Sequence, residues 1–252
     1  MLLAIDIGNS AIKFGVFDGE HLRFKFGIPT DRDYTPDDLE QAVAGSLQFP
    51  FDSAVACSVV PQVEQAVLEF VTRRLQVELL LLDNTFDFGL AIKYETVSTL
   101  GTDRLVNAFA AVAKYGTPLI VCSLGTATTI DVVNDTREYL GGVIAPGIPA
   151  MAEALPMKAI NLPLVDITKP ASVIGTTTVD SIRSGIYYGY ASLLDGLIRR
   201  IASEFGTLLA PKVIATGGFA NLIVPECESI DITDENLLLD GLRLLSDKRS
   251  AV

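Results

Sequence analysis

The sequence predicts an α/β fold made of two duplicated lobes. An apolar run at residues 2–5 leads into a polar turn within Asp6–Lys13, and a similar run leads into Ser123–Ile130, 117 residues later. Each turn is followed by a β-prone run, at 12–17 and 128–133, so each copy has the pattern of a β-hairpin. Strand patterns alternate with helical patterns elsewhere in both halves, as expected of an α/β protein.

Both copies of the hairpin have the same spacing to the next turn signal. From Asp6 to Asp18 is twelve positions, and from Ser123 to Asp135 is twelve again. The two hairpins are therefore expected to superimpose without a gap. Small and polar residues at such turns let backbone N–H groups approach a bound anion, so each turn is a candidate phosphate site. Two ordinary hairpins in one sheet-rich domain are the alternative.

The first half is expected to begin with three strands and to continue as alternating helices and strands. The first helix has an N-cap signal at Thr35, with proline at the next position. No clear period occurs over residues 83–100, which have the pattern of a long connection. The expected elements are strands at 2–6, 12–17, 21–27, 54–57 and 77–82, and helices from residue 36 and at 61–75.

The second half is expected to repeat this beginning and to add a long helix. Glycine and proline are dense at 141–147, which indicates unusual backbone angles there. The spacing of the repeat favours two lobes, at 1–100 and 101–252. The expected elements are helices at 104–114, 179–204 and 236–245, strands at 119–124, 128–133, 138–144 and 212–215, and a turn at 216–220.

The composition and residue pattern of the chain disfavour several classes of function. A net charge of −12 disfavours nucleic-acid binding, which depends on clustered Lys and Arg. The single histidine, His21, is expected at a surface or strand edge, which disfavours histidine-dependent nucleophilic catalysis and His-ligated zinc. Three widely separated cysteines and the lack of a signal or membrane-spanning pattern indicate a reduced, soluble, cytoplasmic protein without a membrane partner.

Five sequence blocks occur in an order and spacing that resemble one known family. The blocks are Asp6-x-Gly8-Asn9-Ser10, Gly101-Thr102-Asp103-Arg104, Gly125-Thr126-Ala127-Thr128-Thr129, Gly141-Gly142-x-Ile144-x-Pro146-Gly147 and Thr216-Gly217-Gly218. Together they resemble the type III pantothenate kinases, within the superfamily of actin, Hsp70 and the sugar kinases. The resemblance implies an actin-like (ribonuclease H-like) fold with ATP in the cleft between the lobes. It also implies ATP-dependent phosphorylation of pantothenate, the first step of coenzyme A synthesis, by a homodimer that uses Mg²⁺ and a monovalent cation, K⁺ or NH₄⁺.

The resemblance implies the residues that bind ATP. Asp6 is a carboxylate beside a glycine turn, suited to holding Mg²⁺ through water. Taken alone, Asp6 is equally explained as a turn-capping residue and Lys13 as a solvated strand lysine. The implied ATP-binding residues are Asp6, Ile7, Gly8, Asn9, Ser10, Ala11, Ile12, Lys13, Thr126, Gly217 and Gly218.

The resemblance also implies the residues that bind pantothenate. Asp103 corresponds to the catalytic base that accepts the hydroxyl proton, and Arg104 to a substrate ligand. By local pattern alone, Thr102 or Asp103 is a helix cap, and Thr178 is the N-cap of the long helix. The implied substrate-binding residues are Tyr94, Gly101, Thr102, Asp103, Arg104 and Thr178.

One position departs from the family pattern. The family commonly has an aspartate of its monovalent-cation site where this chain has Ser123. Serine removes a negative charge, so the cation requirement is expected to be weakened or absent. The alternative is a catalytically impaired regulatory or binding protein that keeps the fold. A kinase of another small alcohol or acid is a third hypothesis, which the block at Gly101–Arg104 disfavours.

Overall fold

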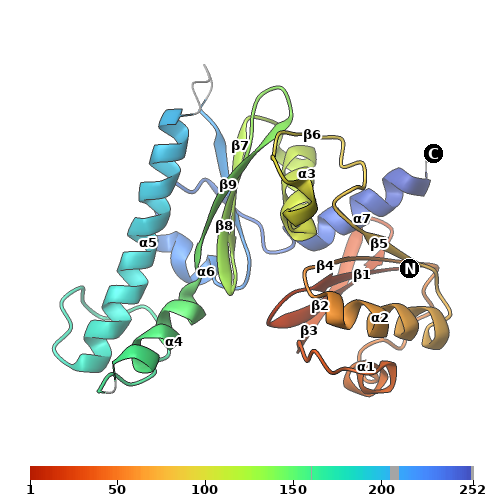
Figure 1. Cartoon of the computed structure of the whole chain (residues 1–252), viewed down its shortest axis with the longest axis horizontal. Helices are drawn as coiled ribbons and strands as arrows, with labels where there is room; N and C mark the ends of the chain where they lie inside the picture. Colours follow the sequence, from red (N-terminus) through yellow and green to blue (C-terminus); the bar gives the residue numbers. More distant parts are fainter. Residues whose placement is uncertain (160, 205–209, 251–252) are drawn as a thin grey trace. The chain divides into compact units, whose positions relative to one another are not determined.

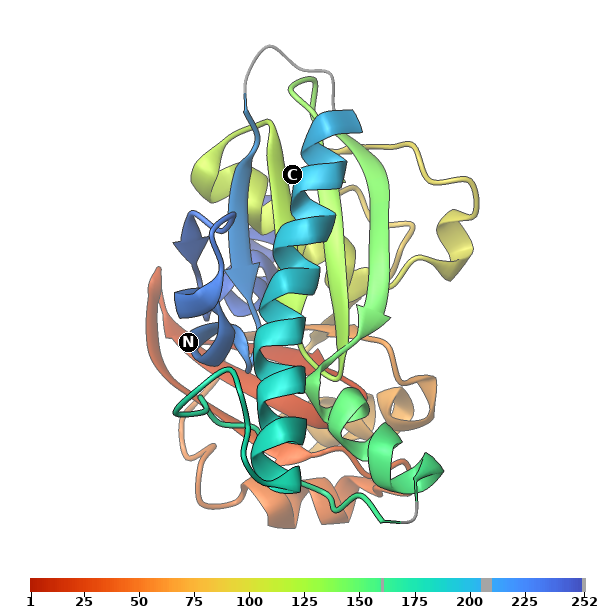
Figure 2. The same ribbon diagram turned by 90° about the vertical axis from the view of Figure 1, so that its left-hand side faces the viewer.

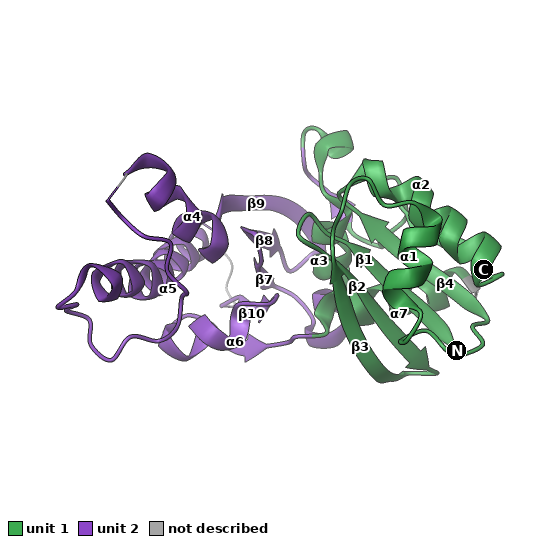
Figure 3. Cartoon of the chain, turned by 90° about the horizontal axis from the view of Figure 1, so that it is seen from below, with its two compact units in different colours: residues 1–90, 95–110, 236–252 green, residues 91–94, 111–235 purple. Residues whose placement is uncertain are grey.

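A computed structural model describes residues 1–159, 161–204 and 210–250. The chain forms two compact units, which are coloured separately in Figure 3. Unit 1 comprises residues 1–90, 95–110 and 236–252, and unit 2 comprises residues 91–94 and 111–235. The order of helices and strands along the chain can be followed in Figure 1.

Unit 1 is built on a five-stranded sheet with the order β3-β2-β1-β4-β5. The strands β1, β2 and β3 form an antiparallel meander, whereas β4 and β5 continue the sheet parallel to β1. Buried apolar residues dominate β1 and β4, as expected of central strands covered on both faces. The strands are β1 Leu2–Ile7, β2 Ala11–Asp18, β3 His21–Pro29, β4 Ser53–Ser58 and β5 Leu79–Leu82.

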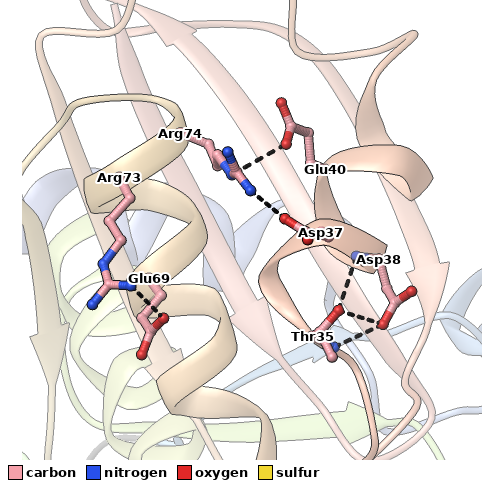
Figure 4. A network of polar contacts seen from close by, with 7 residues as sticks. All are labelled: Thr35, Asp37, Asp38, Glu40, Glu69, Arg73 and Arg74. Carbon is pink, nitrogen blue, oxygen red and sulfur yellow. Dashed lines mark hydrogen bonds and ion pairs between the residues drawn. The ribbon is translucent and has the colours of Figure 1, made fainter.

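Helices α1 (Pro36–Val43) and α2 (Pro61–Glu69) supply apolar side chains to the core of unit 1. Helix α1 begins at Pro36 after a complete capping box between Thr35 and Asp38, which confirms the predicted cap. Figure 4 shows Arg74, beyond α2, paired with Asp37 and Glu40 of α1. These ion pairs are exposed, so the buried apolar faces contribute most of the packing energy.

Helix α7 (Leu237–Ser250) is the C-terminal element of unit 1, where it contacts β1, β2 and β4. Gly241 brings α7 close to α3 (Thr102–Tyr115), since a Cβ there would lie 2.9 Å from atoms of Val106 and Ala110. The compact units therefore differ from a division after residue 100, because α7 contacts the N-terminal sheet and the first part of α3 belongs to the same unit.

Unit 2 repeats the strand order of unit 1. Its sheet runs β11-β10-β7-β8-β9-β6, and the first five strands match β5-β4-β1-β2-β3 in order and direction. This correspondence confirms that the fold is duplicated. The strands are β6 Ala91–Ile92, β7 Leu119–Leu124, β8 Ala127–Val133, β9 Glu138–Pro146, β10 Lys212–Thr216 and β11 Ile232–Thr233.

Helix α5 (Thr178–Glu204) runs along one face of the unit 2 sheet, as Figure 2 shows. Its buried side chains, Tyr187 and Tyr190 among them, form a core with apolar residues of β7, β8 and β10. Helix α4 (Ile148–Lys158) contacts α5 and β9, and the short α6 (Ala220–Ile223) follows β10.

Three details differ from the sequence-based expectations. The hairpins do not superimpose without a gap: Ile7 pairs with Ile12, whereas Leu124 pairs with Thr128, so the second turn is one residue shorter. The helix expected at 61–75 becomes a π-helix from Phe70. Helix α4 was not predicted. The unusual backbone angle expected within 141–147 is, in contrast, confirmed at Gly141, which has a φ of +110° inside β9.

Candidate active site

The first candidate phosphate turn joins β1 to β2 in unit 1. Gly8 donates its N–H to the carbonyl of Ala11 at 3.1 Å, which closes the turn. The Oγ1 of Thr30 donates to the Gly8 carbonyl at 2.6 Å, and the Thr30 N–H donates to the Ser10 carbonyl. Asn9 and Ser10 remain exposed. The turn is thus fixed by residues behind it and presents its tip outward, an arrangement that suits anion binding.

Asp6 lies at the end of β1, directly before this turn. Its side chain is buried, and burial raises the pKa of its carboxyl group, although Lys13 beside it acts in the opposite direction. The Nζ of Lys13 lies 3.2 Å from Oδ2 of Asp6. A buried carboxylate with one cationic neighbour is costly for stability, so its presence at a strand end indicates a functional role.

Asp6 is also chemically suited to a divalent cation. Mg²⁺ commonly binds through one or two carboxylates, with phosphates and water as the other ligands. Among the described residues no three His, Cys, Asp or Glu side chains form a ligand group, so a metal here would depend on the nucleotide for further ligands.

The segment Gly101–Arg104 lies at the same end of the unit 1 sheet. A Cβ on Gly101 would lie 3.6 Å from Val59, and Val59 donates its N–H to the carbonyl of Ile7 at the end of β1. Burial raises the pKa of the Cys57 thiol well above its usual value, and the negative charges of Asp6 and Asp103 raise it further. Cys57 is paired in register with Asp6, and Gly101 lies beside Val59, so Asp6 and the Gly101–Arg104 segment are at one end of the same sheet.

The first turn of α3 fixes the orientation of Asp103. Its Oδ1 accepts the N–H of Arg104 at 2.9 Å, and Asp103 is half-buried. A side chain on Gly101 would collide with this oxygen, because its Cβ would lie 2.5 Å from it. Because α3 begins at Thr102, neither Thr102 nor Asp103 is its N-cap, and that expectation is wrong; Asp103 instead pairs with one N–H of the first turn, which is compatible with the proposed role as base.

The second candidate phosphate turn, Gly125–Ala127, joins β7 to β8 in unit 2. Gly125 donates its N–H to Ala127, and Gly147 donates to the Thr126 carbonyl, both at 3.1 Å. Thr126 and Ala127 are exposed. A Cβ on Gly147 would lie 2.1 Å from the Gly125 carbonyl oxygen, so only glycine permits this approach.

The predicted adenosine motif adjoins the same turn. Gly217 has a φ of +98°, and a Cβ there would lie 2.5 Å from the Leu124 carbonyl oxygen. Gly218, in contrast, has no atom within 4 Å of its Cβ direction. The structure therefore brings Thr126, Gly217 and Gly218 together within unit 2, with open space at Gly218.

Ser123 is the last residue but one of β7 and has threonines beside it on both neighbouring strands. It is paired in register with Thr129 of β8 and Thr216 of β10, whose side chains share its face of the sheet. The carboxylate of Asp131 lies two residues beyond Thr129, where it accepts hydrogen bonds from Thr129 (3.1 Å) and Tyr139 (2.6 Å). Side-chain hydroxyls can bind a monovalent cation, but they are neutral ligands and lack the negative charge of a carboxylate.

Two predicted substrate residues lie elsewhere in unit 2. Tyr94 follows the edge strand β6, and its ring packs edge-on against Tyr139 with the ring centroids 6.5 Å apart. A Cβ on Gly141 would lie 3.3 Å from the Tyr94 ring. Thr178 is exposed at the first residue of α5. The capping role suggested for Thr178 is wrong, because Thr177 exchanges the capping hydrogen bonds with Asp180.

Sequence reasoning missed residues that support the candidate site. Thr30 directly follows β3, and it contacts Gly8, which is 22 positions away in the sequence and is not linked to it by any local pattern. Gly147 belongs to a recognised block, yet its function as the partner of the second turn depends on the pairing of β8 and β9. The capping residue of α5, Thr177, had a local signal in Asp180 three residues later.

Solved structures with the same architecture define the class of protein. The chain is similar to a putative 2-dehydro-3-deoxygalactonokinase from Sinorhizobium meliloti, with a TM-score of 0.63, 15% identity and coverage of 98% of this chain and 96% of that one. It is equally similar to a putative Baf family transcriptional activator from Campylobacter jejuni, with a TM-score of 0.63, 20% identity and coverage of 99% and 100%. The duplicated sheets have the actin-like fold that these solved structures share, which confirms the predicted fold class.

Sequence comparison identifies the family within this class. The family model of the type III pantothenate kinases matches residues 2–200. A type III pantothenate kinase from Brevibacillus brevis is 41% identical over 257 residues, which cover 100% of both chains. The chain belongs to the type III pantothenate kinase family, as the five sequence blocks predicted.

Proposed function

We propose that this protein transfers the γ-phosphoryl group of ATP to pantothenate and so catalyses the first step of coenzyme A biosynthesis. The observation that carries the proposal is the position of the Gly101–Arg104 segment at the end of β1, where Gly101 lies beside Val59 and the Val59 N–H donates to the carbonyl of Ile7, the residue after Asp6. Full-length similarity to type III pantothenate kinases supports the choice of substrate.

ATP is assigned to the two turns and to the glycine pair. The exposed residues at the tips of the two turns, Asn9–Ser10 and Thr126–Ala127, suit the phosphates, while the open space at Gly218 suits the nucleoside. Lys13 adds a positive charge beside Asp6. Mg²⁺ held by Asp6 would neutralise charge that develops on the phosphates.

Pantothenate is assigned to the start of α3, with Tyr94 and Thr178 as further ligands. Asp103 accepts the proton of the substrate hydroxyl as phosphoryl transfer proceeds, because an alcohol is too weak an acid to lose it beforehand. Arg104 is cationic and suits the carboxylate of pantothenate. Most of the rate acceleration comes from positioning the hydroxyl in line with the γ-phosphorus.

The monovalent-cation site is proposed to be weak. Serine at position 123 provides a neutral oxygen, and its neighbours Thr129 and Thr216 provide further hydroxyls. Asp131 already accepts two hydrogen bonds on that face. We expect K⁺ or NH₄⁺ to stimulate the reaction little or not at all.

A homodimer in the cytoplasm is proposed as the working form. Seven large apolar side chains are exposed on unit 2, whereas Phe49 is the corresponding side chain in the described part of unit 1. Such a concentration is typical of an interface. In the described chain, no helix has both the length and the apolarity to cross a membrane. The seven are Leu140, Ile144, Met157, Leu164, Val173, Ile174 and Val179.

A direct assay of product formation tests the proposal. Purified protein is incubated with ATP, Mg²⁺ and pantothenate, with and without K⁺, and 4′-phosphopantothenate is measured by mass spectrometry. Product in either condition supports the kinase. Calorimetric binding of ATP or pantothenate without any product would instead support the binding or regulatory alternative.

A further inference from the structure

Asn107 is a buried polar residue to which neither the sequence blocks nor the proposed mechanism assigns a role. It lies in α3, and only 3% of its surface is exposed. Its Oδ1 is buried and has no hydrogen-bond partner in the described part of the chain. Native proteins satisfy the great majority of buried polar groups, so an exception requires an explanation.

The position of Asn107 on its helix relates it to the candidate substrate residues. Asn107 follows Asp103 by four positions and Arg104 by three. Residues with these spacings lie on the same side of an α-helix, one turn apart. An unused hydrogen-bond acceptor therefore lies one helical turn from the proposed base and the proposed carboxylate ligand.

We propose that Asn107 is a substrate-positioning residue whose side-chain carbonyl accepts a hydrogen bond from pantothenate. This inference rests on the proposed function. Pantothenate carries a carboxylate, two hydroxyl groups and an amide N–H. The carboxylate suits Arg104, and the reacting hydroxyl suits Asp103. The second hydroxyl or the amide N–H is the donor that Asn107 accepts.

This role explains why the free protein tolerates an unsatisfied group. A buried acceptor without a donor destabilises the folded protein, and the substrate relieves that cost only when it binds. Such an arrangement also favours specificity, because an analogue without the donor leaves the acceptor unpaired in the complex. An enclosed water molecule would satisfy Oδ1 equally well but would give no dependence on substrate.

Kinetics and thermal stability of two variants test the proposal. Asn107→Ala removes the acceptor, and Asn107→Leu replaces it with an apolar side chain of similar branching. We expect the KM for pantothenate to rise about tenfold, as for one lost hydrogen bond, while the KM for ATP stays within about twofold. The Tm of the free protein should rise in Asn107→Leu, which removes the unsatisfied acceptor and keeps the side-chain volume; in Asn107→Ala the lost packing offsets part of this gain.

Asn134→Ala is the matched control. The Oδ1 of Asn134 accepts the N–H groups of Thr136 (3.1 Å) and Glu138 (2.8 Å) in the turn between β8 and β9. This variant should lower the Tm and leave both KM values unchanged, the opposite of the result expected at Asn107.

Three outcomes would overturn the proposal. They are an unchanged KM for pantothenate in both Asn107 variants, an equal rise in both KM values, or a fall in Tm without a kinetic effect. If the wild type binds pantothenate without turnover, calorimetric Kd values replace KM values with the same expectations. A wild-type protein that neither binds nor phosphorylates pantothenate would overturn the proposed function and this inference together.

Discussion

The adjacent glycines Gly217 and Gly218 allow a direct test of the nucleotide site, because their surroundings differ. A Cβ on Gly217 would lie 2.5 Å from the Leu124 carbonyl oxygen, and its φ of +98° is unfavourable for other residues. A Cβ on Gly218 would meet no atom within 4 Å. The same substitution to alanine therefore perturbs the protein at one position and only a bound ligand at the other.

The expected magnitudes follow from these distances. In Gly217→Ala the Cβ must move about 0.9 Å to reach an ordinary contact of 3.4 Å, and we expect a loss of about 1–3 kcal/mol in the free energy of unfolding. In Gly218→Ala the free protein should keep its stability or gain up to about 1 kcal/mol. If the nucleoside occupies the space at Gly218, the added methyl group should raise the KM for ATP about tenfold.

The assay combines thermal unfolding of the free protein with steady-state kinetics. Gly218→Ala should show an unchanged or higher Tm, a raised KM for ATP and an unchanged KM for pantothenate. Gly217→Ala should lower the Tm and also weaken ATP binding. If Gly218→Ala leaves the KM for ATP within about twofold of wild type, the nucleoside does not approach Gly218 and the assignment is refuted.

Three further predictions concern the carboxylates and Ser123. Asp103→Asn should lower kcat about 10²–10⁴-fold with an unchanged Tm, since an amide oxygen can still accept the Arg104 N–H; full activity would exclude Asp103 as the base. Ser123→Asp should increase the stimulation of kcat by K⁺, and an identical K⁺ titration would contradict the account of that site. Asp6→Asn should abolish activity yet raise the Tm at pH 7 by about 2–4 °C. Because burial raises the pKa of Asp6, the wild type loses stability as the pH rises through that pKa, so the gain in Asp6→Asn should vanish as the pH falls below 3.8; a lower Tm at pH 7 would oppose this assignment.

The sequence predicted the elements whose signals are local. The strands of both hairpins and the cap at Thr35 agree with the structure, because apolar runs and capping residues act over a few positions. The match of the strand order in the two sheets was implied by the repeated hairpin, and the structure extends it to five strands in each unit.

Features that depend on pairing between distant residues were not predictable in the same way. The second turn is shorter although the spacing from Ser123 to Asp135 equals that in the first copy. The spacing alone does not determine which residues of the two strands pair. The edge strand β6 has two residues, too few for a periodic signal, yet it attaches Tyr94 to unit 2. Helix α4 contains Pro156 in its interior, which weakens a helical pattern.

In the candidate site, too, the residues with local sequence signals were predictable and those that act through distant contacts were not. The blocks identified the turns and the start of α3, whereas the supports, Thr30 and Gly147, act through contacts between strands. Asn107 belongs to no sequence motif, so the sequence did not indicate a role for it. The proposal depends on its burial and on the absence of a partner for its Oδ1 among the described residues.

The most direct test of the central claim is the formation of 4′-phosphopantothenate by the purified wild-type protein. With ATP, Mg²⁺ and pantothenate, and no added K⁺, the account predicts product in stoichiometric amount with ADP. Absence of product both without and with K⁺, from a protein that thermal unfolding shows to be folded, would contradict it.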